Sequence, residues 1–166
     1  MNEASSRPPP SGDILGRHTV EGFAIRTRKN LDFMHEAHEA GFDVHIVTHL
    51  VNSLVGLVVI PWERTLHDSY RQLALTELEQ KKWPVWDHCD SAQPPTTLWE
   101  LVHNLRHSVA HGRVAFSSDA YTLGEVEFTF TNIPPRNGPR WDGRIQGDAL
   151  FDFCQRLSKM LEGMVG

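Results

Sequence analysis

The chain is poor in cysteine and has no long apolar run, and each shortage excludes a class of protein. Its two cysteines, Cys89 and Cys154, form no CxxC pair. They provide neither a disulfide framework nor a zinc finger, and a reducing cytoplasm is the expected compartment. The longest apolar run, Leu54 to Ile60, is far below the roughly 20 residues that a membrane-spanning helix needs. We therefore expect a cytoplasmic protein with no membrane partner.

An excess of positive charge is also missing. The chain has 16 Lys and Arg residues against 21 Asp and Glu residues, a formal net charge of −5. An acidic chain does not coat nucleic acid through bulk electrostatics, so any RNA site has to be a local cleft. The length and the 40% hydrophobic content suit one domain. The opening segment, rich in Pro and Ser, predicts a flexible arm over residues 1–13, followed by a single domain over residues 14–166.

Hydrophobic periodicity predicts a mainly α-helical bundle. Apolar residues at helical spacing indicate a first helix over about 20–40, which Gly41 ends. The almost wholly apolar stretch 43–60 predicts a central helix that Pro61 stops. The polar exceptions on that helix fall on one narrow stripe of the helical wheel: His45, His49, Asn52 and Gly56.

The rest of the chain predicts further helices and a β-hairpin inserted before the last helix. A third helix is expected over about 68–82. Alternating apolar and polar residues predict a hairpin over 113–133, and 134–143 is rich in turn residues. A last amphipathic helix is expected over about 148–164, with Asp148 as its N-cap. Whether the hairpin determines specificity or contacts another subunit stays open.

One further helix carries the residues with chemical potential. It begins at Thr97, because Thr97 and Glu100 match a capping box and two prolines precede it. It ends at Gly112, a natural left-handed cap. The face opposite its apolar side consists of Glu100, Asn104, His107 and His111, and Arg106 lies between the two faces.

Arginine and histidine are the side chains that hold a phosphate and move a proton near neutral pH. Arg106 and His111, however, lie about 140° apart and roughly 7.5 Å along an ideal helix axis. A second copy of the helix would complete the cleft, so the spacing favours a symmetric dimer. In such a cleft a histidine deprotonates a ribose 2′-hydroxyl and Arg106 stabilises the charge on phosphorus. The chemistry would be RNA cleavage without a metal.

Four segments in order resemble the HEPN superfamily (higher eukaryotes and prokaryotes nucleotide-binding), in particular its prokaryotic, partly plasmid-borne subfamily. They are Arg26–Phe33, Val47–Leu57, Pro61–Arg64 and Leu105–Gly112. The last contains the superfamily motif, an arginine, a polar residue, three further residues and a histidine. The residue after the arginine is most often Asn in the superfamily, whereas here it is His107.

The resemblance implies a dimeric α-helical bundle that acts on RNA without a cofactor. It implies either a metal-independent endoribonuclease of toxin or defence type, or a non-catalytic nucleotide- or RNA-binding module or regulatory partner. An antitoxin or a nucleotidyltransferase is the partner to expect besides RNA or nucleotide. Catalysis would fall on Arg106 and His111, with His107 assisting. Candidate substrate-binding or supporting residues are Asn104, Glu100, Asn52 and His49.

Each of these residues also has an alternative interpretation that does not involve RNA. The histidine stripe is also what a solvated helix face looks like. His49 and Asn52 could instead be polar groups of a buried helix that find partners within the core or across a subunit contact. Capping alone accounts for Glu100. Histidines at 103, 107 and 111 could supply two metal ligands, with His88 and Cys89 supplying a third, yet the chain has no HExxH motif.

Overall fold

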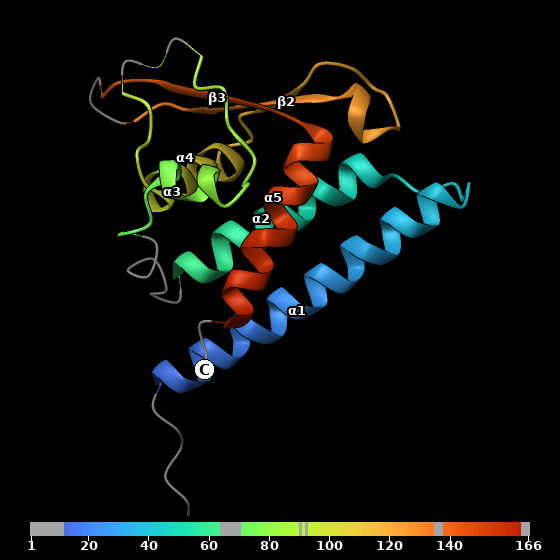
Figure 1. The fold of residues 1–166 in the computed structure, drawn as a ribbon, viewed down its shortest axis with the longest axis horizontal. Helices are drawn as coiled ribbons and strands as arrows, with labels where there is room; N and C mark the ends of the chain where they lie inside the picture. Colours follow the sequence, from blue (N-terminus) through green and yellow to red (C-terminus); the bar gives the residue numbers. More distant parts are fainter. Residues whose placement is uncertain (1–11, 64–70, 90, 92, 135–137, 164–166) are drawn as a thin grey trace, which may run out of the picture.

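Helices make up most of the computed structural model, which describes residues 12–63, 71–89, 91, 93–134 and 138–163 (Figure 1). The mainly α-helical prediction is confirmed. None of the helices in this part of the chain combines the length and apolar character needed to cross a bilayer. The elements are α1 (Gly12–Glu39), α2 (Ile46–Glu63), α3 (Leu75–Gln80), α4 (Leu98–Ala110), β1 (Val114–Phe116), the short 3₁₀ helix η2 (Leu123–Glu125), β2 (Glu127–Asn132), β3 (Trp141–Gln146) and α5 (Gly147–Glu162).

Three long helices form the bundle, and a small sheet covers α4. Helix α1 packs against α5 and α2, and α2 also packs against α5 and α4. Helix α4 contacts β2 as well, so it joins the bundle to the sheet. Figure 1 shows α1, in blue, on one side of the molecule and the sheet with α4 on the other. The motif helix therefore has its apolar face covered from two directions.

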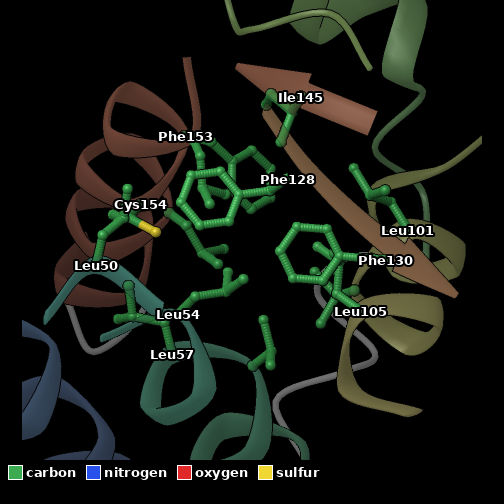
Figure 2. Close-up of a cluster of buried hydrophobic side chains, with 14 of the residues drawn as sticks. Leu50, Leu54, Leu57, Leu101, Leu105, Phe128, Phe130, Ile145, Phe153 and Cys154 are labelled. Atoms are coloured by element: carbon green, nitrogen blue, oxygen red, sulfur yellow. The ribbon is translucent and has the colours of Figure 1, made fainter. Parts of the chain in front are cut away.

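The core lies where the sheet meets the bundle. Phe128 and Phe130 alternate with polar residues along β2, so both point inward and both are fully buried. Figure 2 shows them between α5 and α4, with leucines of α2 on the third side. Burying side chains of this size contributes roughly 1.5–3 kcal/mol each. The leucines in this cluster are Leu50, Leu54, Leu57, Leu101 and Leu105.

The predicted hairpin is part of a three-stranded antiparallel sheet, ordered β1-β2-β3. Val114 pairs with Phe130, and Phe128 pairs with Ile145. Strand β3 was not predicted from the sequence, and its first three residues, 141–143, belong to the segment that we described as rich in turn residues. Gly143 looks like a turn residue in the sequence, yet it occupies an inward position of β3 and the ring of Trp141 covers it. A side chain there would collide with that ring.

Pro61 does not end the central helix, contrary to the prediction. Helix α2 begins at Ile46 rather than residue 43 and continues to Glu63. His45 precedes it, and its carbonyl accepts the first helical hydrogen bond, from the His49 N–H at 3.0 Å. A proline in the last turn removes a single N–H donor, and Pro61 is buried, which compensates for that loss.

Helix α1 is longer than predicted at its start. It begins at Gly12, so the last two residues of the expected 1–13 arm are helical, and residues 1–11 lie outside the described part of the chain. It ends as predicted, because Gly41 has a left-handed φ of 81°. The Phe42 N–H then bonds to the Ala37 carbonyl at 3.0 Å and closes the helix end.

The third helix is much shorter than the predicted 68–82. Residues 64–70 lie outside the described part, and α3 begins only at Leu75 because Ala74 pairs with Thr97 in an isolated β-bridge. The final helix begins one residue before Asp148, which lies in its first turn instead of capping it. Its N-cap is Gln146, and the Gly147 N–H bonds to the Val126 carbonyl at 2.8 Å.

Candidate functional site

The two ends of α4 are defined by the residues that the sequence singled out. The Thr97 hydroxyl accepts from the Glu100 N–H at 3.3 Å, and the Glu100 carboxylate accepts from the Thr97 N–H at the same distance. At the other end Gly112 has a φ of 64°, and the Arg113 N–H bonds to the Ser108 carbonyl at 2.8 Å. The predicted capping box and glycine cap are both confirmed. They determine where α4 begins and ends.

Substituting the cap residue tests this arrangement. Thr97→Ala removes the hydroxyl that satisfies a free N–H in the first turn, and we expect it to lower the free energy of unfolding by about 1 kcal/mol. Thr97→Ser keeps the hydroxyl and should cost only a few tenths. Urea unfolding followed by circular dichroism measures both variants. Equal losses would show that the hydroxyl bond does not stabilise α4.

Glu100 acts at the start of the helix. Its carboxylate also accepts hydrogen bonds from the Thr96 N–H at 2.6 Å and the Thr96 hydroxyl at 2.9 Å. The Thr96 N–H bond is the main reason that the pKa of Glu100 lies below its usual value. These bonds direct the carboxylate toward Thr96 and Thr97, so the structure accounts for Glu100 through capping.

Four rings at intervals of four residues form a continuous column along the open face of α4. The Trp99 and His103 rings are nearly parallel, 18° apart, with centroids 5.4 Å apart. His103 and His107 lie 4.4 Å apart, and His107 and His111 lie 6.2 Å apart at 17°. His111 at the end of the column is exposed. The column therefore runs from a half-buried indole to a solvent-facing imidazole.

Arg106 lies beside this column and against a tryptophan of another helix. Its guanidinium carbon is 5.7 Å from the centroid of the Trp62 ring. The Trp62 ring also lies 5.3 Å from His103 and 5.4 Å from Trp99. A cation over an indole face at this distance is attracted to it. The contact restrains the guanidinium next to the histidines while the side chain stays partly exposed.

The environment of the column favours uncharged imidazoles. Burial is the largest cause that lowers the pKa of His107, and the positive charges of Arg106 and His111 lower it further. Burial also lowers the pKa of His103, with smaller effects of His107 and Arg106, against a hydrogen bond to the side chain of Asn104 that raises it. Near pH 7 His107 is therefore neutral and can accept a proton beside a permanent positive charge.

Removing that positive charge should change the titration of His107. We expect Arg106→Ala to raise the pKa of His107 toward the ordinary histidine value, and Arg106→Lys to keep it low. Two-dimensional NMR of the imidazole nitrogens against pH measures this. His49 is the internal control, because burial alone lowers its pKa and it should not respond. An unchanged His107 titration in Arg106→Ala would contradict their electrostatic coupling.

Asn104 connects the motif helix to the sheet. Its side-chain oxygen accepts a hydrogen bond of 2.8 Å from the amide of Asn132, the last residue of β2. Asn132 is buried, so this bond lies in a protected environment. Asn104 also interacts with His103, as its effect on that pKa shows. The structure thus places Asn104 next to the column, two positions before Arg106, the first residue of the motif.

His49 and Asn52 lie in a different place. Together with Arg26 and Asn30 of α1 they line a hollow of about 320 Å³ between α1 and α2. Gly56 continues their stripe, and the Phe23 ring packs where its side chain would be, 2.5 Å from an added Cβ. None of the residues described as lining this hollow comes from α4. The structure therefore does not bring these two residues to the motif.

His45, the first residue of the polar stripe that we predicted on the central helix, is not part of α2. His45 lies before α2, and its ring packs on Tyr121 at 4.7 Å. Sequence reasoning missed three residues of the column and its surroundings: it did not single out Trp62 or Trp99, and it considered His103 only as a metal ligand. The spacing of four between Trp99, His103, His107 and His111 was the available signal. The contact of Trp62 with this column left no signal in the sequence.

The alternative metal site finds no support among the described residues. No group of three His, Cys, Asp or Glu side chains there is arranged to hold a metal ion. His88 accepts a hydrogen bond of 3.3 Å from the Trp141 indole, and Cys89 lies against Asp87 at 3.2 Å. Both cysteines are free thiols.

A helical bundle whose late helix presents Arg106 and His111 at HEPN spacing defines a module of the HEPN class. The family model described as HEPN pEK499 p136 matches residues 1–165. The chain belongs to this family, and the resemblance inferred from four sequence segments is confirmed. Comparisons with curated proteins and with solved structures find no match.

Proposed function

We propose that this HEPN protein is a metal-independent endoribonuclease of toxin or defence type. The observation that carries the proposal is the surroundings of His107: its ring lies 6.2 Å from the exposed His111 ring, and burial and the charge of Arg106 lower its pKa. A proton acceptor, a fixed positive charge and a second titratable group are the parts that cleavage of RNA by its own 2′-hydroxyl requires.

The reaction follows from these groups. An imidazole takes the proton of a ribose 2′-hydroxyl, and the oxygen attacks the adjacent phosphorus. Arg106 stabilises the negative charge that develops on the phosphate oxygens. A second acid protonates the departing 5′-oxygen, which leaves a 2′,3′-cyclic phosphate on one fragment. His111 is the leading base or acid, and His107 assists or orients it.

The proposal includes a homodimer with α4 at the contact. Arg106 contacts Trp62 of α2, whereas His111 lies at the exposed C-terminal end of α4. Two α4 helices related by a twofold axis would place the arginine of one protomer near the histidine of the other. We expect static light scattering at micromolar concentration to give twice the mass of the chain, and a monomer would contradict the composite site.

The remaining candidate residues take supporting roles in this proposal. Outside the reaction centre, RNA would contact His49, Asn52 and Arg26. The hollow that they line carries the Arg26 guanidinium and side-chain amide groups, which can bind the RNA backbone. Glu100 and Asn104 would hold α4 and its histidines in place. An antitoxin or a nucleotidyltransferase would be the protein partner in a toxin or defence setting.

The test is incubation of the purified protein with defined RNAs in the presence of EDTA, followed by analysis of the fragment ends. Cleavage that leaves 2′,3′-cyclic phosphates supports the proposal. RNA binding without cleavage, dependent on Arg106, would instead favour the non-catalytic nucleotide- or RNA-binding module. Loss of cleavage in EDTA with recovery on adding Mg²⁺ would contradict the metal-independent reaction.

A further inference from the structure

A hollow of about 230 Å³ lies against the N-terminal half of α4, next to the motif. Its walls come from α4, from the sheet with Pro134 and Pro139 beside it, and from residues 93–96, which precede α4. Trp99, His103 and Asn104 belong to α4, and Asn132 and Trp141 belong to the sheet. Pockets that hold drug-sized ligands measure roughly 300–1,000 Å³. A somewhat smaller hollow with aromatic walls suits a single planar ring system.

One ring separates this hollow from the motif histidines. His103 lines the hollow and lies 4.4 Å from His107 on its other side. The Trp99 ring in the wall is stacked on His103, and the Arg71 guanidinium carbon lies 5.5 Å from the centre of that indole. Aromatic faces beside cations are the surfaces on which unpaired bases of single-stranded RNA stack.

The amide pair in the hollow offers a fixed pattern of polar atoms. The bond from the Asn132 amide to the Asn104 oxygen orients both side chains. It leaves the NH₂ group of Asn104 as a donor and the side-chain oxygen of Asn132 as an acceptor for a further partner. A donor beside an acceptor, held by a protein hydrogen bond, complements the edge of a nucleobase.

The charge of the hollow favours a base over a phosphate. The Glu100 carboxylate is part of its lining, and hydrogen bonds from Thr96 and Thr97 stabilise it in the ionised form. A phosphate would be repelled by this negative charge, whereas a neutral base would not. The positive groups of the motif lie at the other half of α4, so the two halves suit different parts of one nucleotide.

We propose that this hollow binds one nucleobase of the RNA next to the phosphate held by Arg106, and that the inserted sheet sets the base preference through Asn132. The assignment rests on the proposed function for its substrate, but binding is measured separately from cleavage. It also gives the sheet, whose purpose the sequence left open, a role in specificity.

The test uses four fluorescein-labelled 2′-O-methyl RNA hexamers, each with one type of base. They lack the free 2′-hydroxyl and cannot be cleaved by the proposed reaction, so fluorescence anisotropy reports binding alone. We expect the wild-type protein to prefer one hexamer. Trp99→Ala should weaken that complex by about tenfold or more, because a stacking surface is lost. Asn104→Ala should bring the four affinities closer together.

Matched variants separate recognition from stability. Trp83→Ala removes another half-buried tryptophan, which packs edge-on against Phe153 and does not line this hollow. Gln80→Ala removes an exposed amide of α3. Both should keep the wild-type preference. Trp99→Phe keeps a ring in the wall and should lose less affinity than Trp99→Ala, and circular dichroism confirms that each variant is folded.

The outcomes distinguish this site from the nuclease proposal. Equal wild-type affinity for the four hexamers, or folded Trp99→Ala and Asn104→Ala variants that bind as the wild type does, would overturn the base site. Cleavage of unmodified RNA with such results would leave the nuclease intact. A base preference lost in Asn104→Ala, without any cleavage, would support the base site and overturn the nuclease. Displacement of the preferred hexamer by the matching nucleoside monophosphate would show that a free nucleotide is recognised too.

Discussion

Replacing Arg106 or His111 with alanine is expected to abolish RNA cleavage while the protein stays folded. A group that transfers a proton contributes about 10²–10⁴-fold to a rate, and one fixed donor to a developing negative charge contributes about 10²–10³-fold. We therefore expect each variant to cleave at least about a hundredfold more slowly. Gel analysis of fragments from a defined RNA in EDTA, at equal protein concentrations, measures the rates.

The fold should tolerate both changes because of where the two side chains lie. His111 is exposed at the end of α4, and Arg106 is half-buried at the edge of its apolar face. Arg144→Ala and His38→Ala are matched controls, since Arg144 is exposed on β3 and His38 lies in the last turn of α1. Both should cleave at the wild-type rate. Full activity of folded His111→Ala would exclude the assigned role, and unfolding of either motif variant would favour a structural role.

Truncating Phe130 is expected to cause the largest loss of stability. Its side chain is fully buried, packs edge-on against Trp86 at 5.7 Å and is stacked with Phe128 at 6.4 Å. Replacing a buried phenylalanine with alanine typically costs about 3–5 kcal/mol, through lost burial and the cavity that remains. We expect Phe130→Ala to lower the free energy of unfolding by that amount.

Urea unfolding provides the measurement, and β1 provides a control. Phe116→Ala lies in the same sheet at a position that is 49% exposed, and we expect it to cost under about 1 kcal/mol. Similar losses for the two variants would show that the sheet does not pack on the bundle as described. A changed slope against urea for Phe130→Ala alone would indicate a less compact native or denatured state.

Features set by neighbouring residues could be predicted from the sequence. The limits of α4 follow from Thr97, Glu100 and Gly112, which act within one turn of the helix ends. Likewise Gly41 ends α1 through its own backbone conformation. The strict alternation in β2 predicted a strand because one of its faces is buried. In each case the cause and its effect lie close together in the chain.

Features set by distant partners could not be predicted. Strand β3 forms because it pairs with an edge of β2. Its alternation of buried and less buried residues is hard to recognise in the sequence, because one of the buried positions is a glycine, Gly143. The start of α3 depends on the bridge between Ala74 and Thr97. At the site, the spacing of α4 identified Arg106, His107 and His111, but not the approach of Trp62 from α2. Such contacts depend on how helices and strands pack against one another. The hydrophobic periodicity of a single segment does not predict that packing.

The hydrogen bond between Asn104 and Asn132 has a consequence for how members of this family can diverge. In the proposed nuclease, residues of α4 would be constrained twice, by the reaction on one face and by the buried core on the other. Among the described residues, this hydrogen bond and the buried Phe130 link the sheet to α4, while Arg144 and Gln146 of β3 face solvent. In the proposed nuclease, a substitution at Asn132 would therefore change the base preference, whereas Arg106 and His111 on α4 would stay in place.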